Sequence, residues 1–186
     1  NRMGRAATPK SYSIDLNLTL EELFAGCTKR LKVTRSRWTG NTTRMDDKIL
    51  EVQVKPGWKD GTKITFAGDG NQENPHTSPG DVVFVVKSKR HPLFVRDGHH
   101  LLHKVRITLQ RALTGFVVPV KTLDGRAIQV RMEEVVNPKT RKIVPNEGMP
   151  ISKTPGSRGD LILEFDIQFP RSLTSVQKEV LSEVLT

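Results

Sequence analysis

The sequence predicts a mainly β protein, with two tandem β-sandwich-like domains of similar topology, a short helix in each, and a further helix at the C-terminus. Three observations lead to this prediction. The chain twice runs from Ser-x-Gly-Asp into an apolar strand, as SPGDVVFVV at 78–86 and SRGDLILEF at 157–165. It twice runs from Thr-Leu to Gly, as TLEELFAG at 19–26 and TLQRALTG at 108–115. With 14 Gly, 11 Pro and only 5% aromatic residues, it favours many short strands around small cores.

Four segments are predicted along the chain. Residues 1–10 are polar and lack the apolar stretch of a signal peptide, so they are interpreted as the remnant of a linker. The first β-domain is expected over 11–88, the second over 89–171, and a C-terminal helix over 172–186. Two copies are too few, and their period is too long, for a solenoid repeat.

Each domain is expected to begin with a strand and a short capped helix. The stretches SYSIDLNL and HKVRI alternate with a strand's period of two. Thr19 and Thr108 can cap the helices that follow, and Gly26 and Gly115 can end them with positive φ. Glu22 stands three residues after Thr19, which is the spacing of a capping box.

Further strands and turns complete each domain. KRLKVTR and FVVPVKT are the strands expected after the helices. In the first domain, VQVKPGWKDGTKITFAG predicts a hairpin, because Pro56-Gly57 and Asp60-Gly61 supply turns between two alternating runs. In the second, Asp124-Gly125 lies between VKTL and RAIQV and predicts a two-residue type I′ turn.

The C-terminal segment LTSVQKEVLSEVLT has the period of an amphipathic helix. Its apolar residues recur on one stripe: Leu173, Val176, Val180, Leu181, Val184 and Leu185. A helix of about 13 residues is too short to be stable alone in water. Its apolar face is therefore expected to dock, either on its own domain or on the same helix of a second chain.

Composition limits the class of protein. The formal net charge of +10 favours an acidic partner, whether nucleic acid, anionic lipid or acidic peptide, without choosing among them. Cys27 is the only cysteine, so no internal disulfide is possible. That suits a reducing compartment, and we expect a cytoplasmic location, with the nucleus as an alternative. No apolar run nears the roughly 18 residues of a membrane span.

No catalytic, cofactor or metal site is predicted. On a strand, His99 and His103 of HHLLH would share a face but lie roughly 13 Å apart, too far to share an ion. No base, nucleophile or oxyanion turn lies near the carboxylates of Asp15, Glu21 or Glu22. The GDGN run at 68–71 lacks the GxxxxGK context of a phosphate loop and is interpreted as a turn.

Five runs, taken in order, resemble the C-terminal region of DnaJ-type co-chaperones: KPGWKDGTKITFAGDG, RDGHHLLHKVRITLQRALTG, TLDGR, NEGMP and SRGDL. The resemblance covers about residues 10–186. One subclass of that family inserts a zinc domain with four CxxCxGxG repeats, so this chain, with its one cysteine, resembles the zinc-free subclass (type II). The His-Pro-Asp tripeptide of the J-domain does not occur in these residues, since His91-Pro92 is followed by Leu93.

The resemblance implies a binding function in the first β-domain and self-association through the C-terminal helix. The implied ligands are unfolded client polypeptides and the acidic Glu-Glu-Val-Asp tail of the seventy-kilodalton heat-shock chaperone. By position, the groove residues fall on Ile14, Leu16, Lys29, Leu31, Val33 and Phe84, with Lys89 associated with the acidic tail. Leu31 stands where some relatives carry Phe. The implied homodimer contacts are Leu173, Val176, Val180, Leu181 and Val184.

Strand periodicity supports part of this groove independently. Ile14 and Leu16 share one face of a strand, and Lys29, Leu31 and Val33 share one face of the next. A row of apolar side chains beside an edge strand suits an extended peptide held by backbone hydrogen bonds. On periodicity alone, however, alternating Ile and Leu are usually core residues, and Phe84 within VVFVV is expected in the core.

Three functional hypotheses remain from the sequence. The leading one is a client- and partner-binding module of a co-chaperone, without membrane or nucleic-acid partners. The second is a basic nucleic-acid-binding protein, motivated by the charge of +10. Against it, the basic residues are dispersed and no aromatic residues are interleaved with them as stacking platforms. The third is an enzyme such as a hydrolase, against which stands the absence of a complete catalytic set.

Overall fold

The computed structural model describes residues 10–185, and the chain in it is mainly β, with a helix near its C-terminal end. The predicted fold class is confirmed. Of the predicted linker remnant, residues 1–9 lie outside the described range. The chain forms two compact units. Among the described residues, unit 1 comprises 10–92 and Met149–Ser157, and unit 2 comprises Leu93–Gly148 and 158–185.

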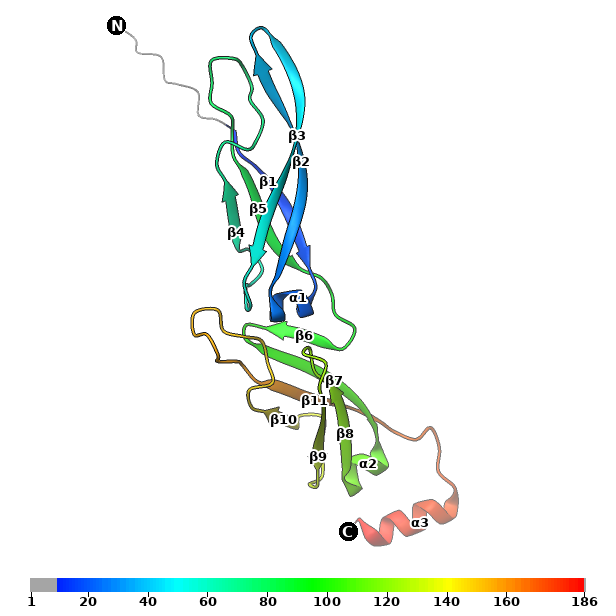
Figure 1. The fold of residues 1–186 in the computed structure, drawn as a ribbon. Coiled ribbons are helices and arrows are strands. Elements are labelled where there is room, and N and C mark those ends of the chain that lie inside the picture. Colours follow the sequence, from blue (N-terminus) through cyan, green and yellow to red (C-terminus); the bar gives the residue numbers. More distant parts are fainter. Residues whose placement is uncertain (1–9, 186) are drawn as a thin grey trace, which may run out of the picture. The chain divides into compact units, whose positions relative to one another are not determined.

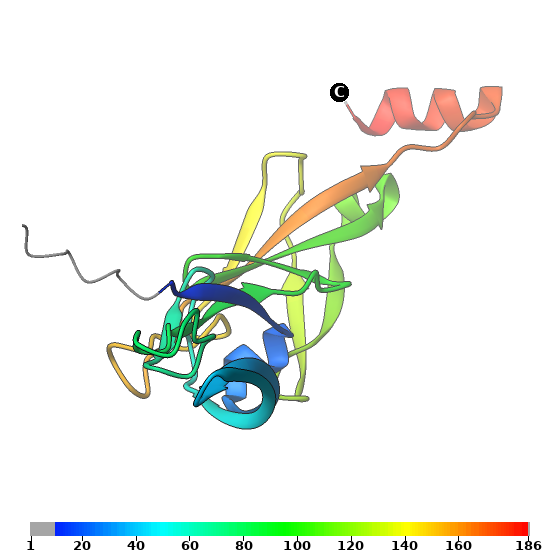
Figure 2. The same cartoon turned by 90° about the horizontal axis from the view of Figure 1, so that it is seen from above.

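Unit 1 contains a three-stranded sheet and a two-stranded ribbon (Figure 1). The sheet has the order β1-β5-β4, with β1 parallel to β5 and β4 antiparallel to it. The ribbon consists of the antiparallel pair β2–β3, which Figure 2 shows almost end-on and strongly twisted. The elements are β1 (Tyr12–Leu18), α1 (Leu20–Ala25), β2 (Cys27–Thr39), β3 (Thr42–Val54), β4 (Lys63–Phe66) and β5 (Val82–Ser88).

Unit 2 repeats this plan with one strand added. Its sheet has the order β10-β11-β7-β6, with β7 parallel to β11, and its ribbon is β8–β9. The elements are β6 (Phe94–Asp97), β7 (His100–Thr108), α2 (Leu109–Thr114), β8 (Phe116–Lys121), β9 (Ala127–Met132), β10 (Arg141–Val144), β11 (Leu161–Gln168) and α3 (Ser175–Val184). In each unit the first strand of the repeat therefore pairs in parallel with the last.

The two short helices begin as predicted. The Thr19 hydroxyl accepts a hydrogen bond from the Glu22 N–H at 3.2 Å, and Glu22 Oε2 accepts one from the Thr19 N–H at 2.9 Å, so the capping box is confirmed. In α2 the Thr108 hydroxyl accepts from the Arg111 N–H at 3.3 Å. The reciprocal bond has no counterpart there, because an arginine cannot accept it.

The helices also end as predicted, at glycines with positive φ. Gly26 has φ 77° and Gly115 has φ 86°. A Cβ at Gly26 would lie 2.8 Å from the Val54 carbonyl oxygen, and one at Gly115 would lie 2.9 Å from that of Met132. Each glycine thus lets the start of the ribbon lie directly against its end.

The repeated Ser-x-Gly-Asp has a structural cause in a close approach between two backbone segments. A Cβ at Gly80 would lie 1.8 Å from the Lys10 carbonyl oxygen, and one at Gly159 would lie 2.1 Å from that of His99. In each unit the chain leading into the last strand touches the chain leading into the first strand of the repeat, and only glycine permits that approach.

The aspartates that follow these glycines form hydrogen bonds to the neighbouring backbone through both side chain and carbonyl. Asp81 Oδ1 accepts from the Gly68 N–H at 2.9 Å, and its carbonyl accepts from the Tyr12 N–H at 3.1 Å. In unit 2, Asp160 Oδ1 accepts from the Asn146 N–H at 3.1 Å, and its carbonyl accepts from the Leu101 N–H at 3.0 Å. The Ser-x-Gly-Asp sequence occurs twice because each unit contains the same close backbone approach and the same aspartate hydrogen bonds.

Two local predictions are wrong. The hairpin predicted from VQVKPGWKDGTKITFAG does not form, because β3 pairs with β2 and β4 pairs with β5. Gly57 and Gly61 do form turns with positive φ, but these turns carry the chain from the ribbon to the sheet. A turn signal locates a change of direction and does not choose the strand that pairs next.

The turn at Asp124-Gly125 is also not of type I′, which needs positive φ at both residues. Only Gly125 has it, at 84°. The Thr122 N–H donates to the Arg126 carbonyl at 2.9 Å, so the loop has three residues rather than two. The Asp124 carboxylate accepts from the Thr122 hydroxyl and from Arg126, which lowers its pKa far below the ordinary value and fastens the loop.

Both sheets and ribbons supply the cores. In unit 1 the most buried side chains include those of Leu18, Leu23, Val52, Val82 and Val86. In unit 2 they include Leu101, Leu161 and Leu163. Along β3 the buried Leu50, Val52 and Val54 alternate with exposed residues, so one face of the ribbon packs inward and the other faces solvent.

Candidate functional site

The predicted groove residues all lie in unit 1, on β1, β2, β5 and the residue that follows β5. Three of them are core side chains, with exposed fractions of 4%, 3% and 1%: Leu16, Val33 and Phe84. Their side chains have almost no surface to offer a ligand. Leu16 and Val33 lie on β1 and β2, the strands that also carry Ile14, Lys29 and Leu31.

The remaining predicted residues reach the surface to different degrees. Ile14 on β1 and Leu31 on β2 are half-buried apolar side chains. Lys29 on β2 is half-buried as well, whereas Lys89 is exposed. Lys29, Leu31 and Val33 share the inward face of the ribbon, as their spacing predicts.

The backbone of β2 has one edge that no strand covers. Within residues 10–185, β2 pairs only with β3, in an unbroken one-to-one register from Cys27 to Thr39. At Ser36 the N–H and the carbonyl both form bonds away from β3, to Asn71 Oδ1 at 2.9 Å and to the Gln72 N–H at 3.0 Å. Because backbone groups alternate in direction along a strand, the even-numbered residues of β2 point the same way.

This alternation defines the open edge of β2, made by the N–H and carbonyl groups of Thr28, Arg30, Lys32 and Thr34. All four residues are exposed. β1 is an edge strand too, since among the described strands it pairs only with β5. Its Tyr12 N–H bonds toward β5, so Ser13, Asp15 and Asn17 direct their backbone groups to the unpaired side.

Three basic side chains of β2 already have carboxylate partners. Lys29 Nζ bonds to Glu22, Arg30 Nε lies 3.1 Å from Glu51 Oε2, and Lys32 Nζ lies 2.7 Å from Asp47 Oδ2. The bond from Lys29 holds the pKa of Glu22 below its ordinary value, and Glu22 in turn raises the pKa of Lys29. Both groups are therefore charged near neutral pH, with Lys89 adding a further favourable charge beside Glu22.

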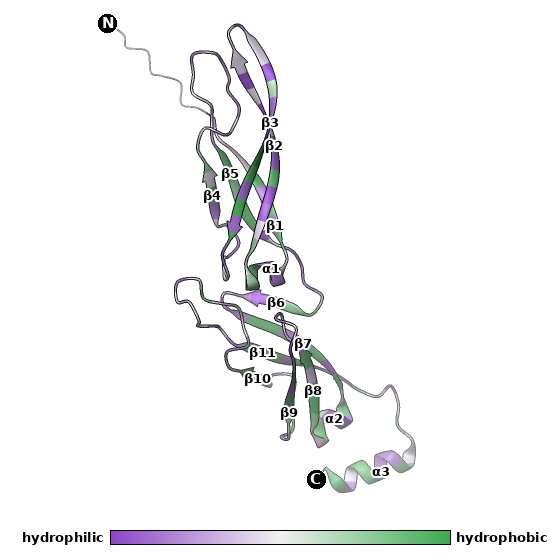
Figure 3. Cartoon of the chain, viewed as in Figure 1, coloured by the Kyte–Doolittle hydropathy of each residue, from purple (hydrophilic) through white to green (hydrophobic). Residues whose placement is uncertain are grey.

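The predicted self-association residues lie on and beside α3. The helix begins at a capping box, in which the Thr174 hydroxyl accepts from the Gln177 N–H at 3.2 Å and the Gln177 side chain accepts from the Thr174 N–H at 2.9 Å. No residue of α3 is buried within the chain. The apolar residues on and beside α3 are all exposed: Leu173, Val176, Val180, Leu181, Val184 and Leu185. Figure 3 shows hydrophobic and hydrophilic residues interspersed along α3.

Neither a cluster of metal-ligand side chains nor a membrane-spanning helix occurs in residues 10–185. No three His, Cys, Asp or Glu side chains in that range lie close enough together to hold an ion. His100 Nδ1 instead accepts from the Asp160 N–H at 3.0 Å, and His103 Nδ1 lies 3.0 Å from the Leu93 carbonyl. No helix in the range is long and apolar enough to cross a membrane.

Sequence reasoning missed the polar backbone part of the site. It selected side chains on the inward face of β2, whereas the open edge belongs to residues of the opposite parity. It also missed Asn71 and Gln72, which bond to the same edge from a loop. No periodic signal marks them, because an edge becomes visible only when the pairing of all strands is known.

The fold and site together define a class: a tandem duplication of one β-rich unit, with an unpaired strand edge in the first copy and an uncovered amphipathic helix at the end. The chain belongs to the DnaJ C terminal domain family, whose family model matches residues 12–170. The recognition made from the sequence motifs is confirmed.

Named relatives agree with this assignment. The chain is 44% identical over 173 residues to human "DnaJ homolog subfamily B member 13", covering 92% of this chain and 54% of that protein. It is 42% identical over 172 residues to "DnaJ protein homolog 1" of Drosophila melanogaster, covering 92% and 51%. It is 35% identical over 178 residues to "Protein SIS1" of Saccharomyces cerevisiae, covering 94% and 49%. The chain thus spans about half the length of these relatives.

Proposed function

We propose that unit 1 binds an extended polypeptide segment along the open edge of β2, and that this is how the chain holds unfolded clients and the Glu-Glu-Val-Asp tail of the seventy-kilodalton heat-shock chaperone. The unpaired edge itself carries the proposal. Backbone hydrogen bonds to an added strand are largely independent of its sequence, which suits clients of many sequences.

The side chains beside the edge support an apolar preference. Leu31 and Ile14 are half-buried, so each can gain further burial against a bound side chain. The fully buried Leu16, Val33 and Phe84 make the support rigid. A pocket for alternate side chains of an extended peptide needs both an accessible apolar surface and a rigid support beneath it.

The charges beside the edge support weak binding of an acidic tail. A ligand carboxylate that reaches Lys29 must compete with Glu22, which already bonds to it. Exposed ion pairs contribute only about 0.2–1 kcal/mol each. The tail should therefore bind weakly, release fast and respond to salt, as handing a client to a second chaperone requires.

We also propose that the chain is a homodimer through α3. The exposed stripe on α3 is what a two-fold pairing of identical helices would bury. Its length alone does not stabilise a helix in water. Two copies of unit 1 in one dimer would then hold a long unfolded chain at two points.

A binding role without catalysis, in the cytoplasm or nucleus, completes the proposal. Cys27 is half-buried and burial raises the pKa of its thiol, which makes a reactive thiolate unfavourable. A nucleic-acid partner is not favoured, because Lys29, Arg30 and Lys32 of β2 are already paired with carboxylates.

The proposal is tested by peptide binding to a Leu31→Asp variant. A charge placed where an apolar client side chain would lie should weaken binding of an apolar peptide about tenfold or more. The matched control is Ile49→Asp, which adds the same charge on the exposed face of the same ribbon. In parallel, a Glu-Glu-Val-Asp peptide should perturb NMR signals of residues 14–33. Unchanged affinity in a folded Leu31→Asp protein, with no perturbation there, would reject the site.

A further inference from the structure

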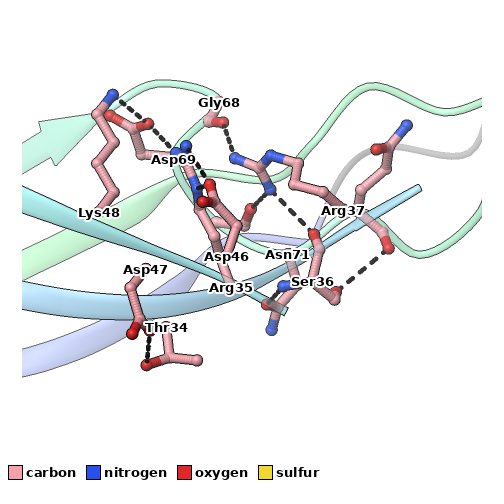
Figure 4. A network of polar contacts seen from close by, with 12 residues as sticks. Thr34, Arg35, Ser36, Arg37, Asp46, Asp47, Lys48, Gly68, Asp69 and Asn71 are labelled. Atoms are coloured by element: carbon pink, nitrogen blue, oxygen red, sulfur yellow. Dashed lines mark hydrogen bonds and ion pairs between the residues drawn. The ribbon is translucent and has the colours of Figure 1, made fainter. Parts of the chain in front are cut away.

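The far end of the β2 edge is occupied by the chain itself. The Ser36 N–H donates to Asn71 Oδ1, the Gln72 N–H donates to the Ser36 carbonyl, and the Trp38 N–H donates to Gln72 Oε1 at 3.1 Å. Figure 4 shows Asn71 against Ser36 at this position. Residues 68–72 therefore supply the bonds that a neighbouring strand would supply, but only beyond Thr34.

Arginines of β2 hold residues 68–72 in this place. Arg37 donates to the Gly68 carbonyl at 2.8 Å and to the Gly70 carbonyl (Figure 4). Both bonds are to backbone, so they fix the path of the loop whatever its side chains do. Arg37 thereby ties the loop to the strand whose edge it covers.

Charge at Asp69 adds a second attachment. Arg35 pairs with Asp69 and lies 2.9 Å from Asp46 Oδ2, and Lys48 Nζ lies 2.7 Å from Asp69 Oδ1. The bonds from Lys48 and Arg35 lower the pKa of Asp69, so the carboxylate stays ionised and the attachment persists across the neutral range.

The loop leaves a defined length of edge uncovered. The open groups run from Thr28 to Thr34, and at 3.3 Å per residue they span about 20 Å. An extended peptide of about seven residues covers that distance. A longer segment lying along the same edge would run into Asn71.

We propose that residues 68–72 act as a built-in stop that sets the length and register of the extended segment bound at the open edge, with Asn71 and Gln72 as specificity-determining residues. This inference rests on the proposed function of unit 1. A bound segment ends, or turns away from β2, where these two side chains begin.

A series of peptides tests the stop. Fluorescent peptides of five, seven, nine and eleven residues, built from one repeated apolar sequence, are titrated against the 186-residue chain. Affinity should rise to seven residues and then level off. In an Asn71→Ala/Gln72→Ala variant the nine- and eleven-residue peptides should gain about tenfold over the unmodified chain, because the N–H groups of Ser36 and Trp38 lose their side-chain acceptors and become available to the peptide.

The control is Asn74→Ala, which alters the same loop but removes a side-chain bond made only to His76. It should keep the plateau at seven residues. The NMR signals of the Ser36 and Trp38 amides should move with the eleven-residue peptide in the double variant alone. A plateau that the double variant leaves unchanged, or affinity that rises through eleven residues in the unmodified chain, overturns the stop. Absence of binding at every length instead overturns the proposed function of unit 1.

Discussion

In unit 1 the first strand of the repeat has one neighbour, whereas its counterpart in unit 2 has two. β1 pairs only with β5 among the described strands, but β7 pairs with β11 on one side and with β6 on the other. β6 covers β7 from His100 to His103. The edge that unit 1 leaves open is therefore partly closed in unit 2 by the chain's own strand.

The ribbons differ at their edges as well. The fourth residue of β2 is Arg30, and the fourth residue of β8 is Pro119. The Thr122 N–H bonds across the hairpin to Arg126, so the odd-numbered residues of β8, Pro119 among them, face away from β9. Proline has no N–H to donate, and on an edge it discourages strand addition.

What the units share is backbone construction, and what separates them is edge chemistry. The close backbone approaches at glycine, the aspartate hydrogen bonds and the capped helices occur in both units. The 13-residue strands of the first ribbon and the open edge of β2 occur only in unit 1. The duplicated fold has kept the same core construction in both copies, while the strand edges of the two copies differ. Five experiments test the proposed dimer, the proposed peptide site and the charges beside it.

Removing residues 172–186 should have the largest effect. Loss of α3 should convert a dimer to a monomer and weaken binding of a long unfolded client about a hundredfold, because two-point attachment is lost. Sedimentation equilibrium and client titration measure both steps. Short-peptide affinity should not change, since the open edge is in unit 1.

A point variant distinguishes the effect of the apolar stripe on α3 from the effect of shortening the chain. Val180→Asp places a charge on the exposed apolar stripe, and Ser182→Asp places the same charge on the opposite side of α3. Only the first should yield a monomer. A full chain that is monomeric at tens of micromolar would end the dimer proposal.

Arg30→Pro gives β2 of unit 1 the proline that β8 of unit 2 has at the matching edge position. It removes an outward N–H from the open edge, and short-peptide affinity should fall about tenfold, or about 1.4 kcal/mol. The fold should survive, because β8 accepts proline at the matching position. Isothermal titration calorimetry measures the loss.

The control for this substitution is Glu51→Pro, because Glu51 lies opposite Arg30 and loses the same ion pair. It blocks the edge of β3 instead. Equal losses from the two prolines, in proteins that both remain folded, would show that the peptide does not distinguish the two edges.

Glu22→Gln should strengthen binding of the acidic tail by about threefold, an effect of the size of one exposed ion pair. The substitution releases Lys29 from its internal carboxylate. Glutamine still accepts the Thr19 N–H, so the capping box of α1 stays intact. Fluorescence anisotropy of a Glu-Glu-Val-Asp peptide at two salt concentrations tests this, with an apolar peptide of unchanged affinity as the control.

The smallest effect is on acid stability. The pKa of Glu22 is lowered in the folded chain, so its ionised form stabilises the fold above its ordinary pKa, and that contribution is lost as the pH falls through the folded value. Below about pH 4 the unmodified chain should lose this stabilisation, whereas Glu22→Gln should lack the step. Urea unfolding at a series of pH values reveals the difference, and identical pH profiles would contradict it.

Short-range sequence signals specify the local features of the fold. Thr19 and Glu22 specify a capping box from side-chain chemistry three residues apart, and Gly26 and Gly115 mark helix ends that need positive φ. The repeated Ser-x-Gly-Asp revealed the duplication, and the DnaJ-like runs revealed the family. In each case the information lies within a few residues, so a pattern can express it.

Strand pairing, and with it the set of free strand edges, depends on contacts between segments far apart in the sequence. β4 follows β3 across two turns yet pairs with β5, whereas β3 pairs with β2. The open edge of β2, the Asn71 and Gln72 bonds that shorten it, and the proline edge of β8 all depend on backbone groups that every residue carries. Side-chain patterns do not encode the direction of a backbone N–H, so these features become visible only when the whole set of pairings is known.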